Sequence, residues 1–396
     1  MAWRSLDEAK LSGARALVRV DFNVPMSGGR VSDDTRLLAA LPTLDRLRDG
    51  GAKVALLAHF DRPKGKRVPE MSLQPVAARL AELLGRPVTF VNDCVGEPVR
   101  QALDAAQPGD VLLLENVRFH GGEEANDAAF ARDLAANADI YVNDAFSAAH
   151  RAHASTEAVA RLVPSYCGEA MARELKALQA ALGDPKRPVL GIVGGSKVST
   201  KLDLLDNLVT RLDMLAIGGG MANTFLFADG VDVGGSFCEK EMADTARQIR
   251  ARAARSGCEL LLPVDVVVAE EVKPGAESHV RALGEIGPGE KILDAGPRTV
   301  ERLVAAMDRA KTLIWNGPLG VFEVPPFDAA TNAAARHAAE LAKANRLIAV
   351  AGGGDTVAAL NHAGVAGDMT FVSTAGGAFL EWMEGKTLPG VQALQH

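Results

Sequence analysis

Short apolar runs alternate with helix-length segments along almost the whole chain, and this alternation restricts the folds that it can adopt. In the first half the runs lie at residues 16–20, 54–58, 111–114 and 140–142. In the second half they lie at residues 189–193, 214–217, 347–351 and 371–374. Runs of this length that are rich in Val, Leu and Ile are typical of strands buried on both faces of a parallel sheet. Ala-rich stretches between them predict covering helices at residues 77–84, 128–137 and 334–344, so we predict an α/β fold.

The residues that follow these runs differ between the two halves of the chain. In the first half they are polar or basic, namely Asp21, Asn23, His59, Arg62, Arg118, Asn143 and Asp144. In the second half they are glycines, at residues 194–195, 218–220, 352–354 and 376–377. Ligands of open α/β sheets bind beyond the carboxyl ends of the strands. We therefore predict two binding surfaces, one lined by guanidinium and imidazole groups and the other by backbone N–H groups.

The length of the chain favours two domains, because 396 residues exceed the size at which a single core usually stops growing. An Ala- and Leu-rich segment predicts a helix over residues 169–182, which stops at Gly183, Asp184 and Pro185. A new strand is expected to open at Pro188. We interpret this helix as the connection between two doubly wound domains.

Charge and cysteine content exclude several functional classes. The formal net charge is −7, with no basic surplus, which argues against non-specific binding of nucleic acid. No apolar run reaches membrane-spanning length, and the first residues lack the apolar core of a signal peptide. The four cysteines, Cys94, Cys167, Cys238 and Cys258, are scattered. This spacing favours reduced thiols in a cytosolic protein over a disulfide framework or a zinc site.

The basic residues of the first half predict a site for a small anion. Arg36 stands in the first turn of a predicted helix, where a cation opposes the helix dipole and so is expected to serve another purpose. Each of the others alone has a plainer explanation, a surface arginine or a core histidine. Together, however, His59, Arg62, Arg118 and Arg151 follow strands that share one sheet edge. Arginine binds phosphate and carboxylate bidentately, so we predict a phosphorylated hydroxy acid or a sugar phosphate as the ligand.

The glycine loops of the second half predict a nucleotide site. Residues 194–201 are not a Walker A loop, because Ser196 rather than Gly precedes Lys197, and no dinucleotide fingerprint is present. Glycines nevertheless allow a phosphate to approach the backbone at a helix start, where Lys197 and Lys201 add charge. Residues 352–356 form a second glycine-rich loop of this kind. They add Asp355, a potential Mg²⁺ ligand, and Thr356. Residues 315–323 and 373–377 supply further loops.

Seven segments, in order along nearly the whole chain, resemble the phosphoglycerate kinase family. They are residues 19–25, 33–36, 115–119, 150–153, 194–201, 315–323 and 352–356. The resemblance implies two Rossmann-like domains, residues 1–168 and 188–380, with a cleft between them. It implies a connecting helix and hinge at residues 169–187 and a C-terminal tail, residues 381–396, that returns to the first domain. A cytoplasmic monomer of glycolysis or gluconeogenesis, without nucleic-acid or membrane partners, is the corresponding expectation.

The resemblance also implies roles for individual residues. The residues expected to bind 3-phosphoglycerate or 1,3-bisphosphoglycerate are Asp21, Asn23, Arg36, His59, Arg62, Arg118 and Arg151. Those expected to bind Mg-ADP or Mg-ATP are Lys201, Asn316, Glu323, Gly353, Gly354, Asp355 and Thr356, with Asp355 at the Mg²⁺. Arg36, Lys197 and Gly376 are expected to face the phosphoryl group during transfer.

Two departures from the family pattern concern the anion site. Phe60 and Asp61 stand where the family usually has Leu-Gly, and Ser147 and Ala148 stand where it usually has Gly-Thr. A carboxylate at position 61 opposes anion binding unless it points away or pairs with Arg62. Two alternatives therefore stay open, a carboxylate kinase with another acceptor and a two-lobed anion-binding protein.

The implied reaction needs no general base, because its attacking oxygen is already deprotonated at neutral pH. Catalysis is then expected to come from in-line positioning and charge neutralisation. An acyl phosphate is prone to hydrolysis, so water must be excluded from the site during transfer. We therefore predict that the two domains close about hinges at residues 168–188 and 373–377.

Overall fold

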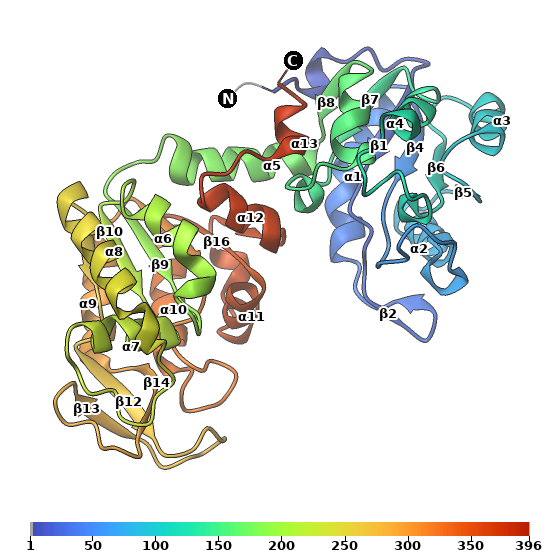
Figure 1. The fold of residues 1–396 in the computed structure, drawn as a ribbon. Coiled ribbons are helices and arrows are strands. Elements are labelled where there is room, and N and C mark those ends of the chain that lie inside the picture. The colour runs from blue at the N-terminus through green and yellow to red at the C-terminus, as the bar shows by residue number, and fades with distance from the viewer. Residues whose placement is uncertain (1–2, 396) are drawn as a thin grey trace. The chain divides into compact units, whose positions relative to one another are not determined.

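The computed structural model describes residues 3–395, which form two compact units. Unit 1 comprises the chain up to Leu175 together with the segment from Thr387 onward, and unit 2 comprises Lys176–Lys386. Each is an α/β unit built on a six-stranded parallel sheet (Figure 1). In the described part of the chain, no helix is both long and apolar enough to cross a membrane.

The sheet of unit 1 has the strand order β5-β6-β4-β1-β7-β8. Its strands are β1 (Arg15–Arg19), β4 (Lys53–Leu57), β5 (Val88–Val91), β6 (Val111–Leu114), β7 (Ile140–Asn143) and β8 (Ser165–Cys167). Its helices include α1 (Thr35–Asp49), α2 (Gln74–Leu84), α3 (Glu97–Ala105) and α4 (Ala128–Ala135), and a two-stranded ladder joins β2 (Met26–Ser27) and β3 (Arg30–Val31). The four strands predicted from apolar runs are adjacent, so their carboxyl ends lie at one edge, as predicted.

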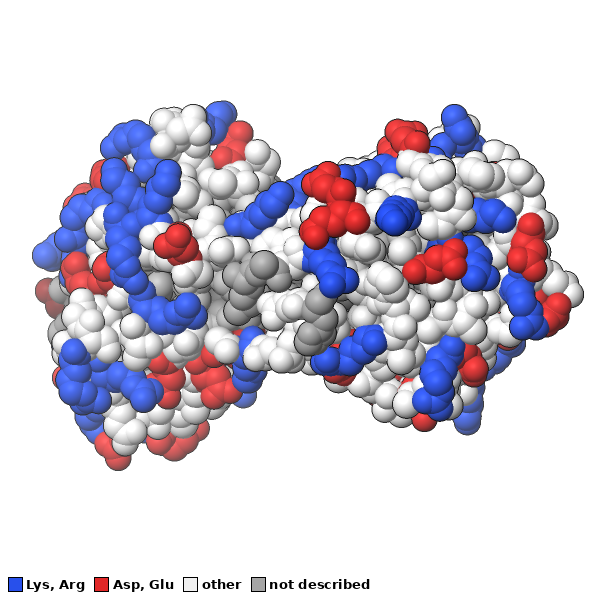
Figure 2. All heavy atoms as spheres, turned by 90° about the horizontal axis from the view of Figure 1, so that it is seen from above, with Lys and Arg blue, Asp and Glu red and all other residues white. Residues whose placement is uncertain are grey.

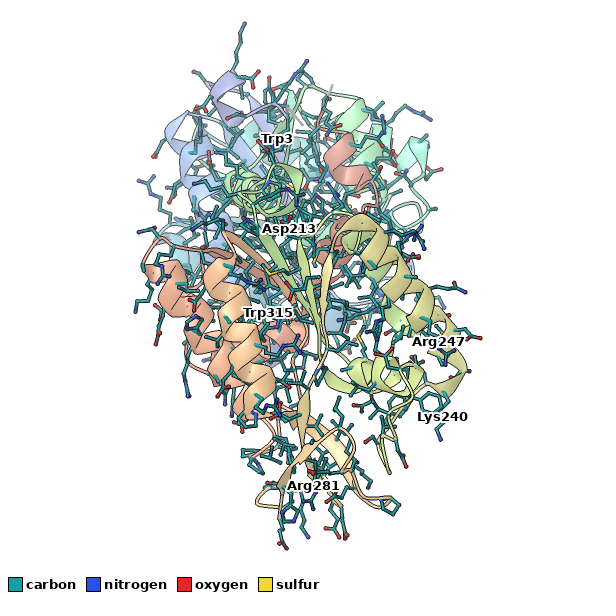
Figure 3. The ribbon with its side chains drawn as sticks, turned by 90° about the vertical axis from the view of Figure 1, so that its left-hand side faces the viewer. Trp3, Asp213, Lys240, Arg247, Arg281 and Trp315 are labelled. Carbon is teal, nitrogen blue, oxygen red and sulfur yellow. The ribbon has the colours of Figure 1, made fainter. Side chains whose placement is uncertain are left out.

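The main sheet of unit 2 has the strand order β11-β10-β9-β15-β16-β17. Its strands are β9 (Val189–Val193), β10 (Met214–Ile217), β11 (Glu259–Leu261), β15 (Thr312–Asn316), β16 (Ile348–Gly352) and β17 (Phe371–Ser373). Its helices include α6 (Leu202–Leu208), α7 (Gly219–Ala228), α8 (Ala243–Ser256), α9 (Pro297–Arg309), α10 (Ala329–Lys343), α11 (Gly354–His362) and α12 (Gly376–Met383). Helices cover both faces of this sheet, as a doubly wound fold requires, and Trp315 of β15 is buried (Figure 3).

Unit 2 also contains a sheet that the apolar pattern did not predict. Strands β12 (Asp265–Ala269), β13 (His279–Ala282) and β14 (Lys291–Ala295) form an antiparallel sheet in the order β13-β12-β14. The expectation of parallel sheets alone is therefore wrong for this segment. Strand β13 was inconspicuous in the sequence because three of its four residues are exposed and it carries no apolar run.

The segment predicted to connect the domains is helical. Helix α5 (Glu169–Leu178) continues as the π-helical turn Gln179–Gly183, and the boundary between the units falls inside it, after Leu175. The buried carboxylate of Asp144 accepts hydrogen bonds from the N–H groups of Ala170 and Met171 and so caps the first turn of α5.

The C-terminal tail joins unit 1 only from Thr387, six residues later than the predicted start at residue 381. Residues 381–386 belong to unit 2 because α12, which packs against α6, extends to Met383. Further along, the short helix α13 (Pro389–Gln392) contacts unit 1 through Gly390, whose N–H donates to the carbonyl of Ala149 at 2.9 Å.

Candidate functional site

The predicted anion-binding residues of unit 1 lie along one sheet edge. Asp21 and Asn23 follow β1, His59 and Arg62 follow β4, Arg118 follows β6, and Arg151 lies beyond β7. Arg36 comes from the first turn of α1, where the carboxylate of Asp33 accepts a hydrogen bond from the N–H of Thr35 at 2.8 Å. The guanidinium of Arg36 reaches the loop after β1.

Arg36 is fixed by two acceptors from the loop after β1. One Nη atom donates to the Asp21 carboxylate at 3.0 Å and to the carbonyl of Asn23 at 2.8 Å. The Asp21 carboxylate also accepts a hydrogen bond from the hydroxyl of Ser147. Ser147, one of the two departures from the family pattern, therefore supports the residue that orients Arg36.

A buried arginine that the sequence analysis did not select lies behind this edge. The side chain of Arg19, the last residue of β1, is 1% exposed. It donates to the hydroxyl of Ser155 at 2.8 Å and lies 3.0 Å from Nδ1 of His59. Ser155 in turn donates to the fully buried Glu123 at 2.6 Å. The only sequence signal was a charged residue inside an apolar run.

The surroundings of the two histidines at this edge favour their neutral forms. Burial holds the pKa of His59 well below its usual value, and the charges of Arg19, Arg118 and Arg151 lower it further. Burial likewise lowers the pKa of His153 to about 4, again with help from Arg118. Both rings are therefore uncharged at neutral pH, and the positive charge of this edge comes from arginine.

Arg118 is held against the loop that carries the other departure. Its guanidinium donates to the carbonyl of Asp61 at 2.7 Å, and the backbone N–H of Asp61 donates to the side chain of Asn23 at 2.9 Å. The φ angle of Asp61 is 52°, in the left-handed region that favours glycine. Its side chain is exposed and pairs with no residue of the described chain, Arg62 included.

Arg62 and Arg151 are less constrained than Arg36 and Arg118. Arg62 is exposed and has no hydrogen bond or ion pair with any residue from 3 to 395. The Nε of Arg151 lies 3.2 Å from Nε2 of His150. The structure therefore joins Asp21, Asn23 and Arg36 by direct contacts, whereas Arg62 shares the edge without contacting them.

In unit 2 the first predicted glycine loop is held by Lys201. Its ammonium donates to the carbonyl of Gly194 at 2.6 Å and to the side chain of Asn316 at 2.7 Å. The amide of Asn316 then donates to the carbonyl of Gly352 at 2.9 Å. Three strand ends are thereby tied together at the glycine edge. Burial lowers the pKa of Lys201 to about 8, opposed by the charge of Asp355.

Close backbone contacts explain why glycine is needed at this edge. A Cβ on Gly194 would lie 1.7 Å from the carbonyl oxygen of Pro318, and Gly353 has a φ angle of 98°. The hydroxyl of Thr356 accepts a hydrogen bond from the N–H of Gly317 at 2.7 Å. Thr356 therefore stabilises the loop after β15 and is itself buried.

The remaining predicted residues of unit 2 are exposed side chains or helix starts. Helices α11 and α12 begin at Gly354 and Gly376, as predicted. The α-helix of the first loop begins later than predicted, at Leu202, because Ser199–Lys201 form a 3₁₀ turn. Lys197 lies 6.0 Å from the ring centre of Phe237.

Asp355 and Glu323 are exposed carboxylates without partners in the described part of the chain. Asp355 stands in the first turn of α11, near the charge of Lys201. An exposed carboxylate beside a glycine loop at a helix start suits Mg²⁺, which takes one or two carboxylates together with substrate phosphates. Glu323 contacts none of the other predicted residues.

A pocket that the sequence analysis missed opens at the carboxyl ends of β10 and β11. It is lined mainly by aliphatic side chains, with Thr299 and Arg302 as polar members; the lining includes Ala216, Ile217, Leu261, Leu262, Leu303 and Leu319. Its wall also includes Gly218, from one of the predicted glycine clusters.

Known proteins similar to this chain share one description. The family model described as phosphoglycerate kinase matches residues 6–386. The phosphoglycerate kinase of Caulobacter vibrioides (strain NA1000 / CB15N) is 71% identical over 395 residues, which cover 100% of both chains. The structure of phosphoglycerate kinase from Coxiella burnetii has a TM-score of 0.94 at 42% identity, covering 99% of each chain. That from Pyrococcus horikoshii OT3 has a TM-score of 0.79 at 29% identity, covering 99% of this chain and 98% of its own.

Proposed function

Because the chain belongs to the phosphoglycerate kinase family, we propose that its two sheet edges bind the two substrates of that reaction. The enzyme is a glycolytic phosphotransferase with a carboxyl group as acceptor. It transfers a phosphoryl group reversibly between 1,3-bisphosphoglycerate and ADP, giving 3-phosphoglycerate and ATP.

The arginine edge of unit 1 is proposed to bind the glycerate. Arg36, Arg118, Arg62 and Arg151 supply charge that persists at any physiological pH. Neutral His59 and the side chain of Asn23 can hydrogen-bond the hydroxyl and carboxyl oxygens. Asp21 already accepts from Arg36 and Ser147, but a carboxylate retains further lone pairs for a substrate hydroxyl.

The glycine edge of unit 2 is proposed to bind the nucleotide. Lys201, Asn316 and the loop of Gly353, Gly354 and Thr356 would surround the phosphates. Glu323 would contact the ribose. When Mg²⁺ is bound by Asp355 and the phosphates, it neutralises part of their charge.

Transfer is proposed to depend on positioning and charge rather than on proton transfer. Arg36, Lys197 and the N-terminus of α12 at Gly376 would stabilise the equatorial oxygens of the phosphoryl group in flight. The neutral state of His59 and His153 is compatible with this mechanism, because the reaction requires neither histidine to accept a proton. We further propose that the units close about residues 168–188 and 373–377 when both ligands bind, which small-angle scattering would detect as compaction.

We further infer a cytoplasmic monomer without nucleic-acid or membrane partners. The arginines of α8 support the absence of a nucleic-acid partner, because Arg247, Arg250 and Arg252 pair with Asp244, Asp229 and Asp206. Acidic side chains accompany basic ones on the face shown in Figure 2. Light scattering of the purified protein tests the oligomeric state.

The observation that carries the proposal is the fixed Arg36, oriented by Asp21 on the edge of arginines. A coupled assay with 3-phosphoglycerate and Mg-ATP tests it directly. We expect turnover with 3-phosphoglycerate, loss of turnover in Arg36→Ala, and none with carboxylates that lack the phosphate. Equal turnover with an unphosphorylated acceptor would instead favour a different carboxylate kinase.

A further inference from the structure

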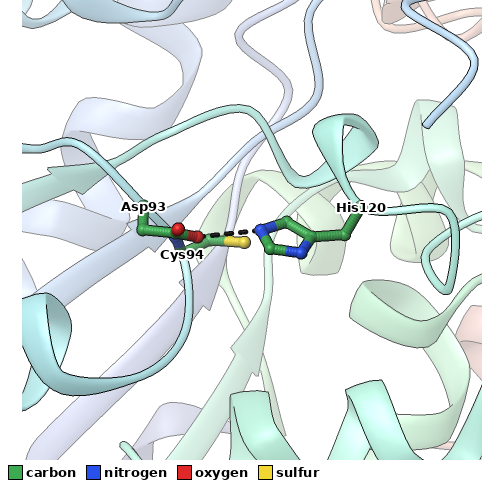
Figure 4. Close-up of side chains that lie close together, drawn as sticks. All are labelled: Asp93, Cys94 and His120. Carbon is green, nitrogen blue, oxygen red and sulfur yellow. Dashed lines mark hydrogen bonds and ion pairs between the residues drawn. The ribbon is translucent and has the colours of Figure 1, made fainter. Parts of the chain in front are cut away.

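Three side chains of metal-ligating type converge in unit 1, in the segments that follow β5 and β6 (Figure 4). Asp93 and Cys94 lie in the loop between β5 and α3, and His120 follows the 3₁₀ turn Val117–Phe119. The Asp93 carboxylate lies 2.8 Å from Nε2 of His120. One ligand atom from each of the three residues lies within 4.8 Å of the other two.

We propose that Asp93, Cys94 and His120 bind one borderline divalent metal ion, of the class of zinc. Thiolate, imidazole and carboxylate are the ligands that this class prefers, whereas Mg²⁺ prefers oxygen alone. Ligands at 2.0–2.3 Å from a tetrahedral ion lie about 3.3–3.8 Å apart, as follows from the usual bond lengths. Small side-chain movements would suffice to reach this geometry, and water would complete the coordination.

The electrostatic surroundings favour a cation at this position. The carboxylates of Asp93, Glu123 and Glu115 all act on the Cys94 thiol as nearby negative charges. Arg67 provides partial compensation through an ion pair with Asp93 at 3.5 Å. A divalent ion would offset the remaining negative charge. On binding, the thiol proton leaves to solvent as the metal–sulfur bond forms.

The ligands are held by neighbouring groups, as outer contacts hold the ligands of established metal sites. The ring of His120 stacks on Phe130 at 5.0 Å between centroids. The Asp93 carboxylate accepts from the N–H of Cys94 at 2.7 Å. None of the three residues belongs to the substrate sites proposed above, so the inference does not depend on them.

Cobalt titration of the purified protein in excess Mg²⁺ tests the site. Co²⁺ stands in for zinc and gives a near-ultraviolet charge-transfer band when a thiolate binds it. We expect the band to saturate at one equivalent of Co²⁺, with release of one proton. We expect Cys94→Ser to abolish it and His120→Gln to weaken binding at least tenfold. The matched control Cys258→Ser, which removes another buried cysteine, should retain the band.

Two results would overturn the proposal. One is the absence of a thiolate band in the folded wild-type protein. The other is an unchanged band in Cys94→Ser, which would place the metal elsewhere. Circular dichroism and kinase turnover establish that each variant is folded, and His120→Gln serves if Cys94→Ser is not, because His120 is partly exposed. Unchanged Co²⁺ affinity in a folded His120→Gln would equally contradict the assignment.

Discussion

A guanidinium nitrogen of Arg19 lies 3.0 Å from Nδ1 of His59, and both side chains are buried at the end of neighbouring strands. Arginine only donates hydrogen bonds, so Nδ1 must accept and the single ring proton must reside on Nε2. The contact therefore fixes both the tautomer and the neutral state of His59. It leaves one N–H of that ring free to donate to an anion.

Replacing Arg19 with methionine should raise the pKa of His59. The substitution removes a positive charge in direct contact with the ring, while the apolar stem preserves much of the packing. Nuclear magnetic resonance of the ring nitrogens measures the pKa and the tautomer. Arg19→Lys, which keeps the charge, is the control and should leave the pKa low. An unchanged value in folded Arg19→Met would mean that burial alone sets the pKa.

Arg36→Ala should reduce kcat on the order of 10²–10³-fold, the usual effect of losing one donor to transition-state charge, with a much smaller change in nucleotide KM. The guanidinium is held by Asp21 and the carbonyl of Asn23, far in sequence from any nucleotide loop. Steady-state kinetics with both substrates varied separate the two constants. Arg36→Lys should recover only part of kcat, because it lacks the planar fork. Near-normal kcat in Arg36→Ala would remove Arg36 from the transition state.

Nucleotide affinity should fall as the pH rises through about 8, the pKa to which burial lowers Lys201. Only the protonated lysine attracts phosphate, so affinity is greatest below this pKa and weakens above it. Calorimetric titration with ADP across this range measures the change. Lys201→Arg stays charged and should bind with no inflection near this pH. An inflection that persists in Lys201→Arg would have to arise from another group.

The free energy of unfolding should rise with pH between about 4 and 6.5 because of His153. Its pKa is about 4 in the folded protein and 6.5 ordinarily, so within this window the unfolded chain binds more protons. The stabilisation is complete above 6.5 and is lost as the pH falls toward 4. Urea unfolding at several pH values measures it. His153→Asn, which cannot titrate, should show a shallower slope; an equal slope would contradict the shifted pKa.

Gly194→Ala should destabilise unit 2 by about 1–3 kcal/mol, the usual cost of overpacking, or prevent its folding. The added Cβ would lie 1.7 Å from the carbonyl oxygen of Pro318, a backbone atom that cannot move aside alone. Thermal unfolding provides the measurement. Gly284→Ala is the matched control, since nothing lies within 4 Å of its Cβ position and its φ is ordinary. Equal melting temperatures for the two variants would contradict this reason for glycine.

The sequence predicted which polar residues lie together where those residues are on a loop directly after a strand. Asp21, Asn23, His59 and Arg118 follow adjacent strands, so strand order alone brings them to one edge. No feature of the sequence indicated the contacts of Arg19, because a charged residue at the end of an apolar run does not reveal which residues it contacts. Ser155, which Arg19 contacts, is 136 residues away.

The period of the apolar runs determined the two parallel sheets, the residues after the runs determined the chemistry of their edges, and the seven family segments indicated the family to which the chain belongs. These properties are local, because they depend on which residues follow each short strand. The tertiary structure decided which polar groups lie in contact, such as Arg19 with His59 and Asp93 with His120. It also decided that Asp61 pairs with no arginine of the described chain and that Ser147 supports Asp21. Burial and contacts between distant segments set charge states, and neither is encoded in any single stretch of sequence.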